Sequence, residues 1–201
     1  MNQKRNFKKE KKTVLKAKSN PTHLKMALIG FRGVGKSSIS RALSDLWNVR
    51  LISMDKYIEI KEEKSIEEIV KLNGWPYFRN LELICLKEIT SLEEFILLDT
   101  GGGILDAGDS TESEEKISIL KNNFFSIYLF MDDSKIFNRL QQLKPSPNRP
   151  SLNENPEQTL VRRKKSYLKA ACAIVDISDC SVTEAAERVF QIAHSHSKKN
   201  H

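Results

Sequence analysis

The chain has 201 residues, of which 39% are hydrophobic and 29% are charged, a composition typical of one globular domain with a hydrophobic core. No apolar run approaches the roughly 18 residues of a membrane span, and no secretory apolar segment follows the start, so we expect a cytoplasmic protein with no membrane association. The three cysteines, Cys85, Cys172 and Cys180, lack C-x-x-C or zinc spacing, which favours buried, reduced thiols.

The net charge of +7 is concentrated at the N-terminus. Residues 1–25 carry eight lysines and one arginine against a single glutamate, a net charge of +8, and the rest of the chain carries −1. Lysine runs of this kind repel themselves, so residues 1–25 are predicted to be a basic, disordered tail. Nucleic-acid binding by this tail is disfavoured, because aromatic residues do not alternate with the lysines.

A phosphate-binding loop is the strongest motif in the sequence. The predicted strand 24–29 leads into Gly30-Phe31-Arg32-Gly33-Val34-Gly35-Lys36-Ser37, and a predicted helix, 36–47, follows. This is the G-x-x-x-x-G-K-[ST] pattern in its strand–loop–helix setting, in which the lysine reaches the β- and γ-phosphates and the serine hydroxyl faces Mg²⁺. We predict that a nucleoside triphosphate binds to Gly33, Val34, Gly35, Lys36, Ser37 and Ser38. Ser37 would also bind Mg²⁺.

A carboxylate follows the second predicted strand, 51–53. Asp55 lies at the carboxyl edge of this strand, where open parallel sheets bind ligands. The same residue could be the N-cap of a helix over 56–61. The two roles are compatible, and the position makes Asp55 a candidate catalytic and substrate-binding residue.

Two helical segments are predicted next. Residues 65–68, Ser-Ile-Glu-Glu, have the spacing of a capping box and open a helix that Asn73-Gly74 ends. Pro76 then opens another helix as a first-turn proline. In this second helix Arg79 and Glu82 are three residues apart and share one face. Helical periodicity alone favours an exposed ion pair for them.

A third strand is predicted over 95–99, and it ends in a carboxylate, Asp99, as a Walker B strand does. Thr100-Gly101-Gly102-Gly103 follows at once. Three consecutive glycines cost backbone entropy and are typical of places where a ligand must approach the main chain closely.

The C-terminal half alternates helices and strands around one long loop. Residues 144–156 are polar and proline-rich, and a loop of this length is typical of a mobile active-site lid. Its only arginine, Arg149, could enter the phosphate site on closure and stabilise charge on the γ-phosphoryl group. A frayed tail is predicted over 196–201, and the histidines His194, His196 and His201 are predicted to be exposed. The remaining predicted elements are helices 112–121, 133–143, 157–171 and 183–194 and strands 124–130 and 174–177.

Six short motifs occur in a fixed order along the chain. They are Gly30–Ser37, Asp55-x-x-x-Glu59, Gly74-x-x-x-Phe78-Arg79-x-x-Glu82, Thr100-Gly101-Gly102-Gly103, Arg149-Pro150 and Arg163-x-x-x-Tyr167-x-x-x-Ala171. In this order and rough spacing the chain resembles the shikimate kinase family. The resemblance implies a three-layer α/β P-loop kinase fold over residues 26–195, in which helices and a mobile lid flank a five-stranded parallel sheet of order 2-3-1-4-5.

The resemblance also implies the activity and the roles of the motif residues. The activity is transfer of a phosphoryl group from ATP, with Mg²⁺, to the 3-hydroxyl of shikimate in aromatic amino acid biosynthesis, by a cytoplasmic monomer. Asp55 would bind the shikimate hydroxyls, and Arg79, held by Glu82, would bind the carboxylate together with Arg163. The lid arginine Arg149 would lie over the ATP phosphates. Backbone contacts to the substrate would come from Gly101, Gly102 and Gly103.

Three positions depart from the family pattern. Ser53 stands where the family usually has the first aspartate of Asp-x-Asp, and our hypothesis is that Asp99 supplies the missing carboxylate to Mg²⁺. Trp75 follows Gly74 where glutamate is usual, and no arginine occurs within 176–180. Two alternatives therefore stay open. One is a kinase of the same fold acting on gluconate or a nucleotide. The other is a weakly active nucleotide-binding regulatory protein that docks through its basic tail.

Overall fold

The computed structural model describes residues 25–106, 111–142 and 155–199, and for residues 197–199 it describes the backbone alone. The basic segment 1–24, Arg149 and nearly all of the predicted lid lie outside the described residues. Among the helices of the described part, none is long and apolar enough to cross a membrane.

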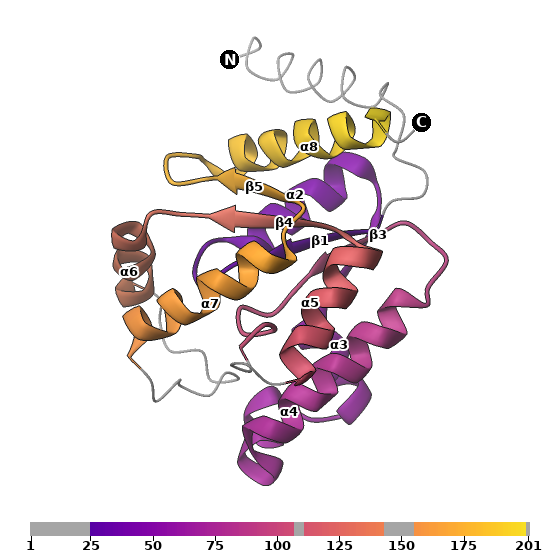
Figure 1. The fold of residues 1–201 in the computed structure, drawn as a ribbon, viewed down its shortest axis with the longest axis vertical. Helices are drawn as coiled ribbons and strands as arrows, with labels where there is room; N and C mark the ends of the chain where they lie inside the picture. The colour runs from indigo at the N-terminus through magenta and orange to yellow at the C-terminus, as the bar shows by residue number, and fades with distance from the viewer. Residues whose placement is uncertain (1–24, 107–110, 143–154, 200–201) are drawn as a thin grey trace, which may run out of the picture.

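A parallel sheet of five strands forms the centre of the molecule (Figure 1). The strands are β1 (Met26–Ile29), β2 (Arg50–Ser53), β3 (Ile96–Asp99), β4 (Phe125–Phe130) and β5 (Ala173–Asp176). Their spatial order is β2-β3-β1-β4-β5, which confirms the predicted 2-3-1-4-5 arrangement. β1 and β3 are buried along their whole length, because helices cover both faces of the sheet and leave no solvent side for polar residues.

Helices lie on both sides of this sheet (Figure 1). On one side α2 (Lys36–Trp47) packs against α8 (Val182–Lys199). On the other side α5 (Thr111–Asn123) packs between α4 (Ile66–Thr90) and α7 (Pro156–Ala170). Two shorter helices, α3 (Met54–Glu62) and α6 (Asp133–Gln142), complete the three layers.

Helix α4 contains the predicted break. Gly74 has φ 80° and ψ 171°, which is not helical, and helical geometry resumes at once with Pro76 in its first turn. The N-terminus of α4 has the predicted capping box, because Ser65 and Glu68 each accept a hydrogen bond from the other's backbone N–H. The break divides α4 into two helical segments with different directions, and the second segment carries Arg79.

Some predictions about individual elements and residues were wrong. The N-cap of α3 is Ser53, and Asp55 lies in the first turn of that helix. Helix α8 continues through Lys199, so residues 196–199 are helical, and His196 stacks on the ring of Phe125 at a centroid distance of 4.1 Å. His196 is therefore half-buried, and so is His194, although both were expected to be exposed; His201 lies outside the described residues. Among the cysteines, Cys85 is buried as predicted, but Cys172 is exposed.

Candidate active site

The phosphate-binding loop connects β1 to α2 at the carboxyl edge of the sheet. Gly33 and Gly35 have φ values of 84° and 104°, which residues with a Cβ rarely adopt. Packing requires a glycine at position 30, because a Cβ on Gly30 would lie 2.9 Å from the carbonyl oxygen of Leu129. Helix α2 has no side-chain N-cap, so no capping side chain competes with an anion at its N-terminus.

Lys36 lies at the start of α2 and is buried. Its Nζ donates hydrogen bonds to the carbonyl oxygens of Gly30 and Phe31, at 2.8 and 3.1 Å. The ammonium group is thereby held over the loop. A second cation approaches the loop from α6, where Arg139 donates a hydrogen bond of 3.4 Å to the carbonyl oxygen of Val34.

A cavity of about 510 Å³ opens beside the loop, and the side chains expected near Mg²⁺ line it. Ser37, Ser53, Asp55 and Asp99 all contribute to its wall. Ser53 and Asp99 are direct neighbours, because β2 and β3 pair in the register that sets them opposite each other. Asp99 is only 6% exposed, and its carboxylate makes no hydrogen bond or ion pair with the part of the chain that the structure describes.

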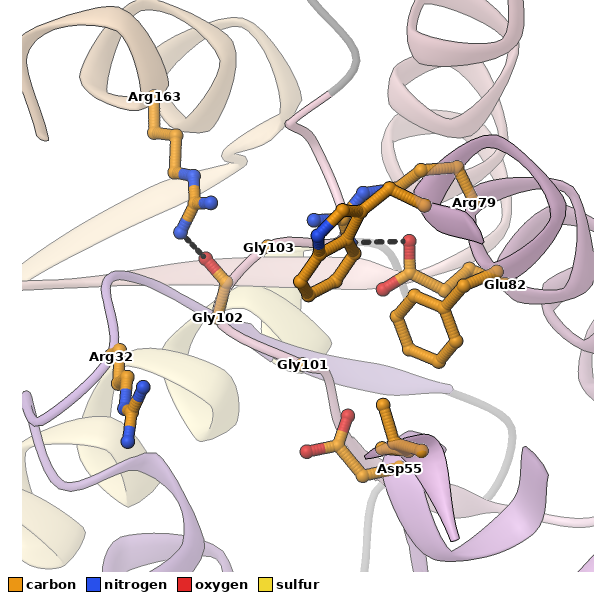
Figure 2. A pocket seen from close by; sticks show the side chains of 11 residues that line it. Arg32, Asp55, Arg79, Glu82, Gly101, Gly102, Gly103 and Arg163 are labelled. Atoms are coloured by element: carbon orange, nitrogen blue, oxygen red, sulfur yellow. Dashed lines mark hydrogen bonds and ion pairs between the residues drawn. The ribbon is translucent and has the colours of Figure 1, made fainter. Parts of the chain in front are cut away.

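A smaller cavity, of about 80 Å³, adjoins the first, and Asp55 lines both. Figure 2 shows the residues around it: Arg79 and Arg163 lie on either side of the glycine turn, and Asp55 faces that turn from α3. The lining also includes Arg32 of the phosphate loop. The cavity thus brings together three helices and the glycine turn, all of which carry predicted substrate residues.

Arg79 is fixed by a buried network. Its Nη1 donates to Glu82 Oε2 at 3.0 Å, and Lys116 Nζ of α5 donates to the same oxygen at 3.1 Å. Glu82 and Lys116 are almost completely buried, so the expectation of an exposed Arg79–Glu82 pair was wrong. Burial lowers the pKa of Lys116 more than the Glu82 carboxylate raises it. The Arg79 guanidinium also lies 5.0 Å from the centre of the Trp75 ring, and this contact limits its orientation.

Arg163 enters the cavity from α7 and is 2% exposed. Its Nη1 donates to the carbonyl oxygen of Gly102 at 3.2 Å, and its guanidinium lies 5.5 Å from the centre of the Phe31 ring. The Tyr167 hydroxyl, whose pKa burial raises, donates to the same carbonyl at 2.6 Å. The Nε of Arg163 is buried and has no hydrogen-bond partner among the described residues.

The glycine turn after β3 has no room for side chains. A Cβ on Gly101 would lie 2.7 Å from Asp55 Oδ1, and one on Gly103 would lie 2.8 Å from Arg79 Nη2. On Gly102 it would lie 2.9 Å from the backbone nitrogen of Arg32. Gly102 is therefore fixed by the backbone of the phosphate loop, whereas side chains at 101 and 103 would displace Asp55 and Arg79.

Comparison with known proteins identifies the family. The shikimate kinase family model matches residues 32–194. The chain belongs to the shikimate kinase family. Its relatives include the shikimate kinase of Staphylococcus aureus strain JH9, which is 40% identical over 126 residues, 63% of this chain and 66% of the relative. The alignment thus spans slightly less than two thirds of the length of these relatives.

Solved structures of shikimate kinases have the same fold. The enzyme from Acinetobacter baumannii in complex with shikimate has a TM-score of 0.74 and 25% identity, covering 92% of this chain and 98% of that one. The Aquifex aeolicus enzyme has a TM-score of 0.70 and 24% identity, covering 87% of this chain and 98% of that one. A thymidylate kinase from Candida albicans, at 18% identity and a TM-score of 0.53, shares the fold, with coverage of 87% and 93%.

In this shikimate kinase family member four predicted residues line the two cavities: Ser37, Asp55, Arg79 and Arg163. Lys36 is held at the phosphate loop. Sequence reasoning missed four charged residues of the site. Lys116 had a detectable signal, because it falls on the buried i, i+3, i+4, i+7 stripe of α5, where an apolar residue is expected. Arg32, Asp106 and Arg139 gave none, since an isolated charge in a loop or a last helical turn is usually solvated.

Proposed function

We propose that this chain transfers the γ-phosphoryl group of ATP to the 3-hydroxyl of shikimate. One observation carries the proposal: two buried guanidinium groups, Arg79 and Arg163, and one carboxylate, Asp55, surround a single cavity next to the phosphate loop. A small polyol that bears one carboxylate fits this set of groups. Membership of the shikimate kinase family supports the same activity.

The arginines would bind and orient the substrate. A planar guanidinium forms two parallel hydrogen bonds with a carboxylate, and both Arg79 and Arg163 line the cavity. Asp55, which lines both cavities, would accept a hydrogen bond from the attacking hydroxyl and hold it toward the phosphate loop. Fixing both reactants in this way removes much of the entropic cost of the reaction.

The residues present fit ATP and Mg²⁺. The uncapped N-terminus of α2 and the glycine-rich loop would hold the phosphates, and Lys36 would leave the loop carbonyls to bind the β- and γ-oxygens. Ser37 would coordinate the metal, with Asp99 in place of the carboxylate that Ser53 lacks. When bound, Mg²⁺ neutralises charge on the transferring phosphoryl group. We assign Arg149, on the predicted lid, to the same task.

The compartment and the oligomeric state are part of the proposed function. We infer a cytoplasmic enzyme and a monomer, as the resemblance to the family implies. Its partners would be small molecules. Size-exclusion chromatography with light scattering tests the monomer.

A coupled assay of ADP release tests the activity. With ATP and Mg²⁺ present, ADP release should depend on shikimate, and Arg79→Ala should lower kcat/KM for shikimate on the order of 10²-fold, because a buried charged contact to the substrate is lost. Arg188→Ala, which changes an exposed arginine on α8, is the matched control and should leave kcat/KM within about twofold. If ATP binds but ADP release ignores shikimate, the substrate assignment is wrong.

A further inference from the structure

Asp106 places a carboxylate of the protein itself against the arginine pair. It lies at the end of the glycine turn, where its N–H donates to the carbonyl oxygen of Gly103 at 2.9 Å, and its side chain is 7% exposed. Its Oδ2 forms an ion pair with Arg163 Nη2 and lies 3.8 Å from Arg79 Nη2. One oxygen therefore bridges the two guanidinium groups.

The other oxygen of Asp106 has a different partner. Oδ1 accepts hydrogen bonds from Nε and Nη2 of Arg162, at 3.0 and 2.6 Å. Arg162 is the neighbour of Arg163 in α7, but its side chain is 45% exposed. Because the two oxygens have separate partners, Oδ2 can lose its contacts while Oδ1 stays bound to Arg162.

The charge of Asp106 persists over the working pH range. Burial alone would raise the pKa of this carboxyl, but hydrogen bonds and charge from Arg163 and Arg162 outweigh burial and hold the pKa below its ordinary value. At neutral pH the arginine pair thus already has a negative partner. Arg79 has a second carboxylate partner, Glu82. Both guanidinium groups of the pair are therefore already next to an anion before a substrate carboxylate binds.

We propose that Asp106 is a specificity-determining residue, an internal carboxylate that competes with the substrate's carboxylate for Arg163 and Arg79. This inference rests on the proposed function. When a carboxylate substrate binds, Oδ2 of Asp106 loses its contacts with Arg163 and Arg79, and the hydrogen bonds between Oδ1 and Arg162 keep the side chain nearby. A ligand without a carboxylate cannot displace Asp106 from the two arginines, so its affinity does not depend on the charge of Asp106. Asp106 therefore sets the affinity for the carboxylate, and it takes no part in the transfer of the phosphoryl group.

Calorimetric titration of the whole chain with shikimate and with its uncharged methyl ester tests this role. Asp106→Asn keeps the shape of the side chain and removes its charge. The variant should bind shikimate more tightly, on the order of fivefold, and bind the methyl ester within about twofold of wild type. In steady-state assays KM for shikimate should fall while kcat is unchanged. Asp133→Asn, which breaks an ion pair with Lys164 on the same helix α7, is the matched control and should change neither affinity.

Weaker binding of shikimate by Asp106→Asn would overturn the inference, because it would mean that Asp106 positions Arg163 and does not compete with the substrate. In that case the proposed function would stand, since wild type still binds shikimate. If neither protein binds shikimate while both bind ATP, the proposed function fails and the inference fails with it. Should Asp106→Asn not fold, as judged by ATP binding and a thermal melt, Asp106→Ser gives the same comparison.

Discussion

Asp99 is the residue for which the structure makes the sharpest case at the scale of single side chains. It faces the cavity that contains Ser37, and its neighbour across the sheet is Ser53. A carboxylate one strand away from the usual position would still reach a metal ion at the same sheet edge. We expect Asp99→Asn to raise the Mg²⁺ concentration needed for tight ATP binding on the order of tenfold. Electron paramagnetic resonance of Mn²⁺ bound with ATP measures this directly.

Two comparisons make the Asp99 experiment decisive. The affinity for ATP without a metal ion should not fall in Asp99→Asn, because the proposed role concerns the metal alone. Asp45→Asn changes an exposed aspartate on α2 and should leave the Mn²⁺ affinity unaltered. An Asp99→Asn protein that binds Mn²⁺ and ATP like wild type would show that Asp99 does not replace the missing carboxylate.

Single residues were predictable from the sequence where a local motif names them. Lys36 and Ser37 are fixed by the spacing of the phosphate loop, and Asp55 by its place after a strand. The pairing of Arg79 with Glu82 was predicted from their spacing, but its burial was not, because Lys116 of another helix covers Glu82 and this packing leaves no local pattern. The same reason hides Asp106, whose partners are 56 and 57 residues away.

At the scale of elements, the break at Gly74 is what orients the second half of α4. Its φ of 80° and ψ of 171° belong to a region that only glycine occupies readily. Gly74→Ala should therefore cost about 1–3 kcal/mol of unfolding free energy and raise KM for shikimate, because Arg79 lies one turn beyond the break. Urea unfolding and steady-state kinetics measure the two effects.

A matched variant on the same helix controls the Gly74 experiment. Lys71→Ala changes an exposed helical position before the break and should shift stability by no more than about 0.5 kcal/mol. If Gly74→Ala is as stable as Lys71→Ala and keeps its KM, the helix does not depend on the special geometry of the glycine.

Element boundaries followed local signals to different degrees. The strands were found because a buried parallel strand is continuously apolar, and α4 because its capping box and glycine break are written in the sequence. The end of α8 was missed, because the His-Ser-His-Ser sequence over 194–197 is polar and carries no apolar stripe. Its helical state depends on tertiary packing, such as the stacking of His196 on Phe125.

At the scale of the whole molecule, the order of the strands could not be derived from local sequence. β1 pairs with β3 and β4, whose residues follow it by about seventy and a hundred positions, and no local propensity encodes such pairs. The order came from the resemblance, which was carried by six motifs in register. The distribution of cysteines shows the same limit, since spacing excluded a metal site but did not reveal that Cys172 is exposed.

The thiols report on the opening of the whole fold. Burial raises the pKa of Cys85 to about 11, so at pH 8 this thiol is both inaccessible and protonated, whereas Cys172 is exposed. Ellman's reagent should modify Cys172 rapidly in the native protein and Cys85 only after unfolding.

Because the folded-state pKa of Cys85 is raised, its protonated thiol contributes stability that is present below about pH 9 and is lost as the pH rises through about 11. Wild type should therefore lose unfolding free energy over that window more steeply than Cys85→Ala. Rapid native labelling of Cys85 in a protein that carries both Cys172→Ser and Cys180→Ser, or parallel pH profiles for wild type and Cys85→Ala, would contradict this account of the core.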